Sequence, residues 1–218
     1  MFLWQSFDYP TDTFLPGMKL GRNFTTGLEV YISSWKSNED PAPGEYTYYL
    51  DTNGYPQGFL KNGSALVYLT GPWNGLEFSG IPNLRINPIF SYEIVINNME
   101  IYYTYKQLTS TIIKFTLSPI GAGQCWTWDN QSMNWLVYVC LPTDNCDRYG
   151  LCGAHGSCNI GNSATCICLD KFSPKYPDKW AKGDWSNGCI RRVSLDCRRG
   201  DGFVKYSGLK LPDTHNSS

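Results

Sequence analysis

The chain has 218 residues, a net charge of −1, 17% charged residues and 15% aromatic residues. This apolar content argues against intrinsic disorder, and the absence of a basic stripe or cluster argues against a nucleic-acid-binding protein. No stretch is apolar for long enough to cross a membrane and no signal peptide follows Met1, so we expect a fragment, truncated at both ends, of a longer protein.

The first 140 residues predict short strands separated by turns. Extended runs are expected at residues 28–35, 45–50, 92–97, 101–108, 111–117, 126–129 and 135–139. Residues 40–44 (DPAPG) are expected to break the chain, and the pairs Asn53-Gly54 and Asn62-Gly63 favour hairpin turns. Strands at roughly ten-residue spacing predict an all-β sandwich, barrel or prism, and no helix is expected.

The nine cysteines all lie between Cys125 and Cys197. Six of them form a compact set, namely Cys146, Cys152, Cys158, Cys166, Cys168 and Cys189. Dense, even-numbered cysteines in a segment too short to build a core predict a disulfide framework and an oxidising, extracellular compartment. Their spacing does not choose among the pairings, and it disfavours zinc because the only close pair is C-x-C. Predicted N-glycosylation sites are Asn23, Asn62 and Asn130, with a fourth sequon at Asn216.

Several motifs, taken in order, resemble one plant protein family. Residues 3–13 (LWQSFDYPTDT) and 15–21 (LPGMKLG) are similar to the end of the bulb-type, mannose-binding-type lectin domain of S-locus glycoproteins and S-domain receptor-like kinases. Residues 71–75 (GPWNG) and 78–82 (FSGIP) resemble the adjoining S-locus glycoprotein domain. Residues 144–153 (DNCDRYGLCG) resemble its EGF-like module, and Cys197 with residues 200–203 (GDGF) resembles the entry to a PAN/apple domain.

The resemblance implies a β-prism, lectin-like domain followed by a small disulfide-rich EGF-like module. The implied boundaries are 1–22 for the end of the bulb-type lectin domain, 23–141 for the S-locus domain, 142–190 for the EGF-like module and 191–218 for a linker and the start of the PAN/apple domain. The implied disulfides are Cys146–Cys158, Cys152–Cys166 and Cys168–Cys189, with Cys197 bonded to a cysteine outside this chain. Cys125 and Cys140 depart from the family pattern. We predict a disulfide between them because both flank adjacent predicted strands, although the sequence leaves open that they are unpaired.

The resemblance also implies a function in recognition at the plant cell surface. The expected protein is a receptor-like kinase ectodomain or a secreted glycoprotein that binds a small cysteine-rich peptide or another protein. Its expected role is self-incompatibility (recognition of pollen) or defence signalling, and the ectodomain could form a homodimer. By position, the ligand-contacting segments correspond to residues 84–110 and 129–139. The candidate contacts are Arg85, Tyr92, Tyr102, Tyr103 and Tyr105. Because Tyr103 and Tyr105 share a strand face that Tyr102 opposes, at most one of these two sets is exposed.

Two other kinds of function deserve comparison with recognition. Carbohydrate binding by a lectin-like surface is the alternative, although the lectin domain's sugar-binding repeats lie upstream of Met1, so mannose binding is not carried over. A catalytic centre is not predicted, because His155 and His215 are the only histidines and no phosphate-binding loop or nucleophile elbow occurs. Any kinase activity of the parent protein would reside outside this chain. No cofactor, metal or calcium site is expected, since Asp144 is the single acid before the first cysteine of the module.

Overall fold

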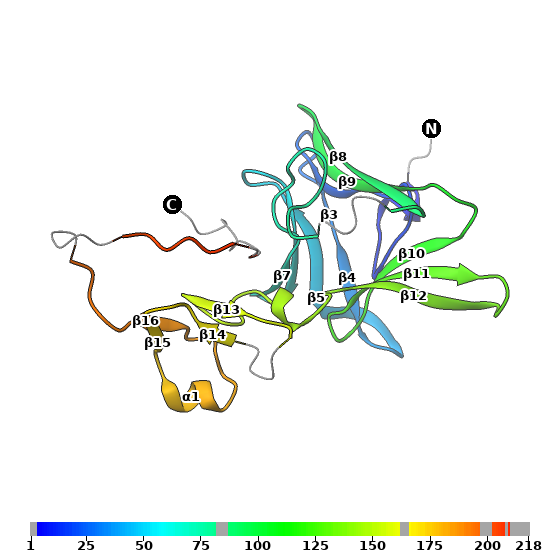
Figure 1. Cartoon of the computed structure of the whole chain (residues 1–218). Helices are drawn as coiled ribbons and strands as arrows, with labels where there is room; N and C mark the ends of the chain where they lie inside the picture. Colours follow the sequence, from blue (N-terminus) through cyan, green and yellow to red (C-terminus); the bar gives the residue numbers. More distant parts are fainter. Residues whose placement is uncertain (1–3, 82–86, 162–165, 197–201, 208, 210–218) are drawn as a thin grey trace. The chain divides into compact units, whose positions relative to one another are not determined.

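The computed structural model describes residues 4–81, 87–161, 166–196, 202–207 and 209. The chain divides into two compact units, Met1–Thr143 and Asp144–Ser218, and each has its own sheets (Figure 1). Nearly all of the regular structure is strand, which confirms the predicted all-β class. Within the described residues, the longest helix is far too short and polar to traverse a lipid bilayer.

In the described residues of the first unit, the strands form three four-stranded antiparallel sheets, which confirms the β-prism. The first sheet has the order β1 (Thr13–Phe14), β10 (Ile113–Leu117), β11 (Gly123–Asp129) and β12 (Asn134–Leu141). The second has the order β3 (Glu29–Val30), β2 (Leu20–Asn23), β9 (Glu100–Gln107) and β8 (Phe90–Ile96). The third is a meander of β4 (Ile32–Ser37), β5 (Asp40–Asp51), β6 (Gln57–Asn62) and β7 (Ala65–Leu69).

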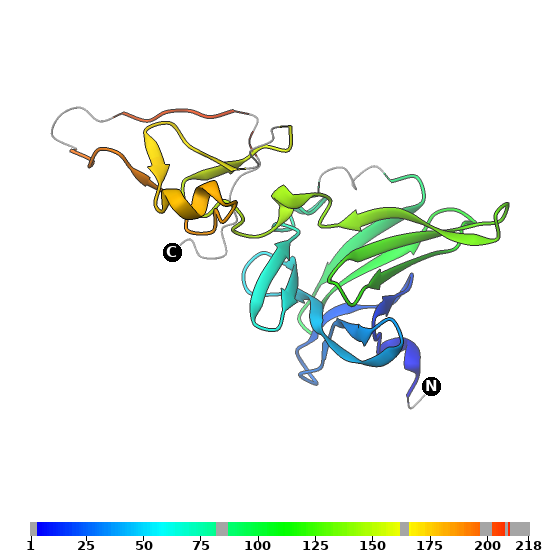
Figure 2. The same ribbon diagram turned by 90° about the horizontal axis from the view of Figure 1, so that it is seen from below.

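The N-terminal strands belong to sheets that are otherwise built much later in the chain. After the short 3-10 helix η1 (Ser6–Asp8), β1 pairs with β10 and β2 pairs with β9. Figures 1 and 2 show these blue strands beside the green strands β8 to β12. The boundary expected at residue 22 remains a prediction, but both strands that precede or cross it belong to the first compact unit.

The core of the first unit draws on all three sheets. Its most deeply buried side chains are Phe14, Leu20, Ile32, Leu60, Tyr68, Ile113 and Leu117. Burying an aliphatic or aromatic side chain of this size contributes about 1.5–3 kcal/mol. A Cβ at Gly21 would collide with the backbone carbonyl of Ile101, so a glycine allows β2 to lie against β9.

The segment 40–44 does not break the chain as expected, because β5 runs without interruption from Asp40 to Asp51. Its pairing with β6 begins only at Tyr46, so Pro41 and Pro43 lie where β5 has β4 as its single neighbour. A proline lacks a backbone N–H, and this costs little where no second strand needs the donor. The predicted Asn-Gly turns are confirmed: positive-φ Gly54 and Gly63 lie in the β5–β6 and β6–β7 connections.

The second unit has little regular structure. It contains the 3-10 helix η3 (Asn145–Asp147), the β13–β14 pair (Gly156–Cys158 and Cys166–Cys168), the β15–β16 pair (Phe172–Pro174 and Cys189–Arg191) and α1 (Pro177–Ala181). The helix was not predicted; Pro177 starts it and positive-φ Gly183 follows its end. Among the described residues of this unit, the buried hydrophobic side chains are Cys152, Cys166 and Cys189. Covalent cross-links therefore replace an apolar core here.

Candidate recognition surface

Three of the four predicted tyrosine contacts pack against the core: Tyr105 is buried, while Tyr92 and Tyr103 are half-buried. Tyr105 is buried, its ring lies 5.2 Å from that of Phe14, and its hydroxyl donates a 2.9 Å hydrogen bond to the Phe14 carbonyl. Tyr103 lies two residues away on the same strand face, where burial and the neighbouring Tyr48 raise its pKa well above the ordinary value. Tyr92 is paired with Tyr105 in register and packs on the rings of Trp73 and Tyr103.

The fourth tyrosine, Tyr102, lies on the outward face of β9. The Nζ atom of Lys19 is 4.1 Å from its ring centroid and 2.8 Å from a carboxylate oxygen of Glu100. A second ion pair, Lys106 to Glu93 at 2.8 Å, joins β9 to β8 on this face. The outward face of β8 and β9 is therefore charged and carries one half-buried tyrosine. Arg85, the remaining predicted contact, lies outside the described residues.

A cluster of indoles that the sequence reasoning missed lies on the outward face of the β10–β11–β12 sheet. We call it the tryptophan face, and it comprises Lys114, Trp126, Trp128, Trp135 and Val137. The rings of Trp128 and Trp135 meet edge to face at 5.5 Å, and the Nζ of Lys114 is 4.3 Å from the Trp135 ring. The pattern Trp-x-Trp at 126–128, followed by a third tryptophan after a turn, was the available signal.

Strand β12 also exposes apolar side chains at the edge of this sheet. Val137 and Tyr138 retain 44% and 41% of their accessible surface, and Leu136 is exposed as well. Tyr138 connects the two segments predicted to contact ligand, because its hydroxyl accepts a 3.3 Å hydrogen bond from Asn87 Nδ2 and its ring lies 6.5 Å from that of Phe90. The structure thus brings residues of 84–110 and 129–139 into contact at β12.

The predicted disulfide between Cys125 and Cys140 is wrong, because both are free thiols. A β-bulge in β12 shifts the register so that Cys125 faces Val139, while Cys140 faces Gln124. Residues directly opposite share a face, so the two sulfur atoms lie on opposite faces of the sheet. Cys125 points into the core, where burial raises its thiol pKa to about 11.

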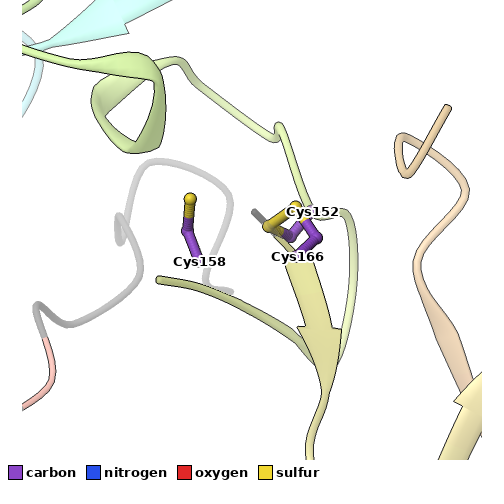
Figure 3. Close-up of side chains that lie close together, drawn as sticks. All are labelled: Cys152, Cys158 and Cys166. Atoms are coloured by element: carbon purple, nitrogen blue, oxygen red, sulfur yellow. A yellow bond between two sulfur atoms is a disulfide. The ribbon is translucent and has the colours of Figure 1, made fainter. Parts of the chain in front are cut away.

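The six clustered cysteines form three disulfides in the second unit. The bonds are Cys146–Cys158, Cys152–Cys166 and Cys168–Cys189, the pairs that the resemblance implies. The sulfur atoms of Cys152, Cys158 and Cys166 lie within 4.8 Å of one another (Figure 3). Each is already bonded to another sulfur, so this cluster is two adjacent disulfides and not a set of thiolate ligands for a metal.

The remaining predicted sites occupy turns or strand ends. Asn130 is exposed in the β11–β12 turn, whereas Asn23 and Asn62 end strands β2 and β6 and are half-buried. Glycosylation at these three residues remains a prediction, and Asn216 lies outside the described residues. His155 stacks on Phe172 with ring centroids 4.4 Å apart, while His215 also lies outside the described residues.

Comparison with known proteins identifies the family. A model of the S-locus glycoprotein domain matches residues 68–176, which is half of the chain. The chain belongs to the S-locus glycoprotein family. A model described as D-mannose binding lectin matches residues 1–36, in agreement with the resemblance of the N-terminal motifs.

Relatives in this family align with nearly the whole chain. It is 40% identical over 99% of its length to "Receptor-like serine/threonine-protein kinase SD1-8" from Arabidopsis thaliana, and 41% identical over 98% to "S-locus-specific glycoprotein BS29-2" from Brassica oleracea var. alboglabra. It is also 38% identical over 98% to "G-type lectin S-receptor-like serine/threonine-protein kinase SRK" from Arabidopsis thaliana. The chain spans 26%, 49% and 25% of the lengths of these three relatives, respectively.

Proposed function

We propose that this chain is the extracellular recognition region of an S-domain receptor-like kinase or of a secreted S-locus glycoprotein. Relatives named as receptor kinases and as S-locus glycoproteins both contain this region, so the proposed role does not depend on a kinase being attached. Three disulfides in the second unit support a location outside the cytosol, where such bonds persist. In a receptor kinase, ligand binding here would be the input and phosphorylation would be carried out elsewhere in the protein.

The observation that carries the proposal is the exposed apolar surface of β12. Val137 belongs to the tryptophan face and Tyr138 is its neighbour in β12, so aromatic and aliphatic groups are concentrated on one accessible part of the first unit. Aromatic residues are enriched at the centres of protein interfaces, where a few of them supply most of the binding energy. The charged face of β8 and β9, including Tyr102, would contribute polar contacts around this apolar centre.

We propose a small, secreted, cysteine-rich peptide as the ligand of this surface, in a role such as recognition of pollen or defence signalling. A protein surface suits the site better than a sugar does, because the tryptophan face is broad and mainly apolar. Pairing of two ectodomains would be a further use of the same edge, since β12 has no strand beyond it within the described part of the sheet.

Surface plasmon resonance with the immobilised 218-residue chain tests this function. The probes are oxidatively folded cysteine-rich peptides from plant pollen coats, each applied alone. For a peptide that binds, Val137→Asp and Tyr138→Ala should each weaken affinity by about tenfold or more, the effect expected of interface hot spots. The matched control is Tyr55→Ala, which removes an exposed tyrosine from the β5–β6 connection.

Two outcomes would contradict the proposal. One is peptide binding that neither β12 substitution weakens although both variants retain the wild-type circular dichroism spectrum. The other is a chain that ignores every peptide and binds saccharides on a glycan array, which would favour the carbohydrate alternative.

A further inference from the structure

A groove of about 300 Å³ is built from a part of the first unit that the proposed ligand surface does not use. Its lining comes from the segment after η1, from β3 and β4, and from the first part of β5. The side chains that matter here are Tyr9, Glu29, Tyr31, Ser33, Trp35 and Pro43.

The pleat of β4 determines which side chains line the groove, and one backbone hydrogen bond holds the neighbouring loop in place. Ile32 and Ser34 point into the core and are almost fully buried, so Ser33 and Trp35 point outward. Trp35 lies opposite Pro43 in the register of β4 and β5, which places a ring of each type side by side. The Ser33 amide donates a 2.8 Å hydrogen bond to the Thr11 carbonyl and fixes the loop beside the strand.

Exposed aromatic rings make this groove unusual for a protein surface. Tyr9 and Tyr31 keep about half of their accessible area, at 47% and 49%. The ring of Trp4 stacks on that of Tyr9 with centroids 5.9 Å apart and extends the aromatic surface. Contiguous exposed aromatic groups of this kind mark binding sites more often than they mark plain surface.

The charge of the lining narrows the choice of ligand. Glu29 is the only ionisable acid or base among the lining residues other than the tyrosines. Its carboxylate pairs with Arg22 at 3.4 Å, but both side chains are exposed, so this pair is weak and exchangeable. Arg22 is not a lining residue, so the one formal charge of the lining itself is negative, and a ligand with a basic group could compete with Arg22 for this carboxylate.

We propose that this groove binds a proline-rich peptide in the polyproline II conformation, with a lysine or arginine of the peptide beside Glu29. Proline rings pack on the faces of aromatic rings, and the preformed helix loses little entropy on binding. A saccharide fits less well, because its hydroxyl groups need several convergent polar partners. The lining has no amide side chain, its Ser34 hydroxyl is buried and accepts from the Tyr46 amide, and its Thr11 hydroxyl already donates to Asp12. Besides the tyrosine hydroxyls, this leaves Ser33 and Glu29 as polar partners.

Fluorescence anisotropy with the intact, disulfide-bonded 218-residue chain tests the proposal. The probe is a fluorescein-labelled peptide of ten prolines followed by one lysine. Tyr9→Ala and Tyr31→Ala should each weaken its binding about three- to tenfold, because each removes a ring-stacking contact. Tyr55→Ala is the matched control: Tyr55 is 77% exposed, lies outside the groove, and its removal should leave the affinity unchanged.

The charge contact is tested separately with Glu29→Gln. This variant should bind the lysine-bearing peptide less tightly, and should bind ten prolines without lysine as the wild type does. The proposal is overturned if the folded wild-type chain shows no saturable binding of either peptide, or if Tyr55→Ala weakens binding as much as Tyr31→Ala does. It is equally overturned if a neutral oligosaccharide such as cellohexaose binds in the groove and neither peptide competes with it.

Discussion

Replacement of Phe14 by alanine tests whether the N-terminal strand is an integral part of the first unit. Phe14 is 2% exposed, and its ring lies 5.7 Å from that of Tyr103 and 5.2 Å from that of Tyr105. A buried Phe→Ala substitution costs about 3–5 kcal/mol through lost burial and the cavity that remains. We expect a value near 3 kcal/mol, because β1 has only two residues and can relax into the space. That is a large part of the ~5–15 kcal/mol that stabilises a typical domain.

The assay is urea unfolding followed by tryptophan fluorescence. In a Trp180→Phe and Trp185→Phe background every remaining tryptophan lies in Met1–Thr143, so the signal reports on the first unit alone. With an m value of about 1–3 kcal/mol/M, Phe14→Ala should lower the midpoint by about 1 M or more. Phe24→Ala is the matched control: Phe24 is 50% exposed and should cost no more than about 0.5 kcal/mol. Equal midpoints for the two variants would refute the assignment of β1 to this core.

Three further predictions concern the cysteines and the buried tyrosines. Removing the Cys168–Cys189 bond by Cys168→Ala with Cys189→Ala should destabilise the second unit by about 3 kcal/mol, since the bond closes a loop with a sequence separation of 21. Hydrogen exchange in β15 and β16 that stays at the wild-type rate would contradict this. Iodoacetamide at pH 8 should label half-exposed Cys140 and spare buried Cys125, whose thiol pKa burial raises to about 11. Peptide mapping that finds Cys125 labelled first in the folded chain would show that Cys125 is not buried. Burial raises the pKa of Tyr103 and Tyr105 above the ordinary 10.0, so the stability that their neutral hydroxyls contribute is present below pH 10 and is lost as the pH rises above it. A melting temperature of the first unit that does not fall between pH 9 and pH 12 would contradict this prediction.

Local patterns in the sequence were sufficient to predict much of this fold. The Asn-Gly pairs marked two hairpins because only a few residues tolerate positive φ, and the density of cysteines marked the second unit because it has little else to bury. Strand β6 was not predicted, for an equally physical reason. Residues Gln57 to Leu60 at the start of β6 are all buried, so this strand shows no alternation of polar and apolar residues.

The site was harder to predict because it depends on register and on which strand face is buried. Alternation showed that Tyr103 and Tyr105 share a face of β9, but only the packing on Phe14 shows that this face is internal. One bulged residue in β12 places Cys125 and Cys140 on opposite faces of the sheet. Without that extra residue, both side chains would lie on the same face of the sheet. A bulge leaves no clear signature in a single sequence.

The pairing of β1 with β10 has a practical consequence for receptor chimeras. The D-mannose binding lectin model ends at residue 36, yet a strand inside that match completes a sheet whose other members lie beyond residue 112. A graft that exchanges the lectin portion at its sequence boundary would therefore splice a foreign Thr13–Phe14 strand onto the host's β10. Chimeras of these proteins should take both partner strands from one parent, because these strands are hydrogen-bonded to each other in one sheet, whatever the sequence boundary between the domains.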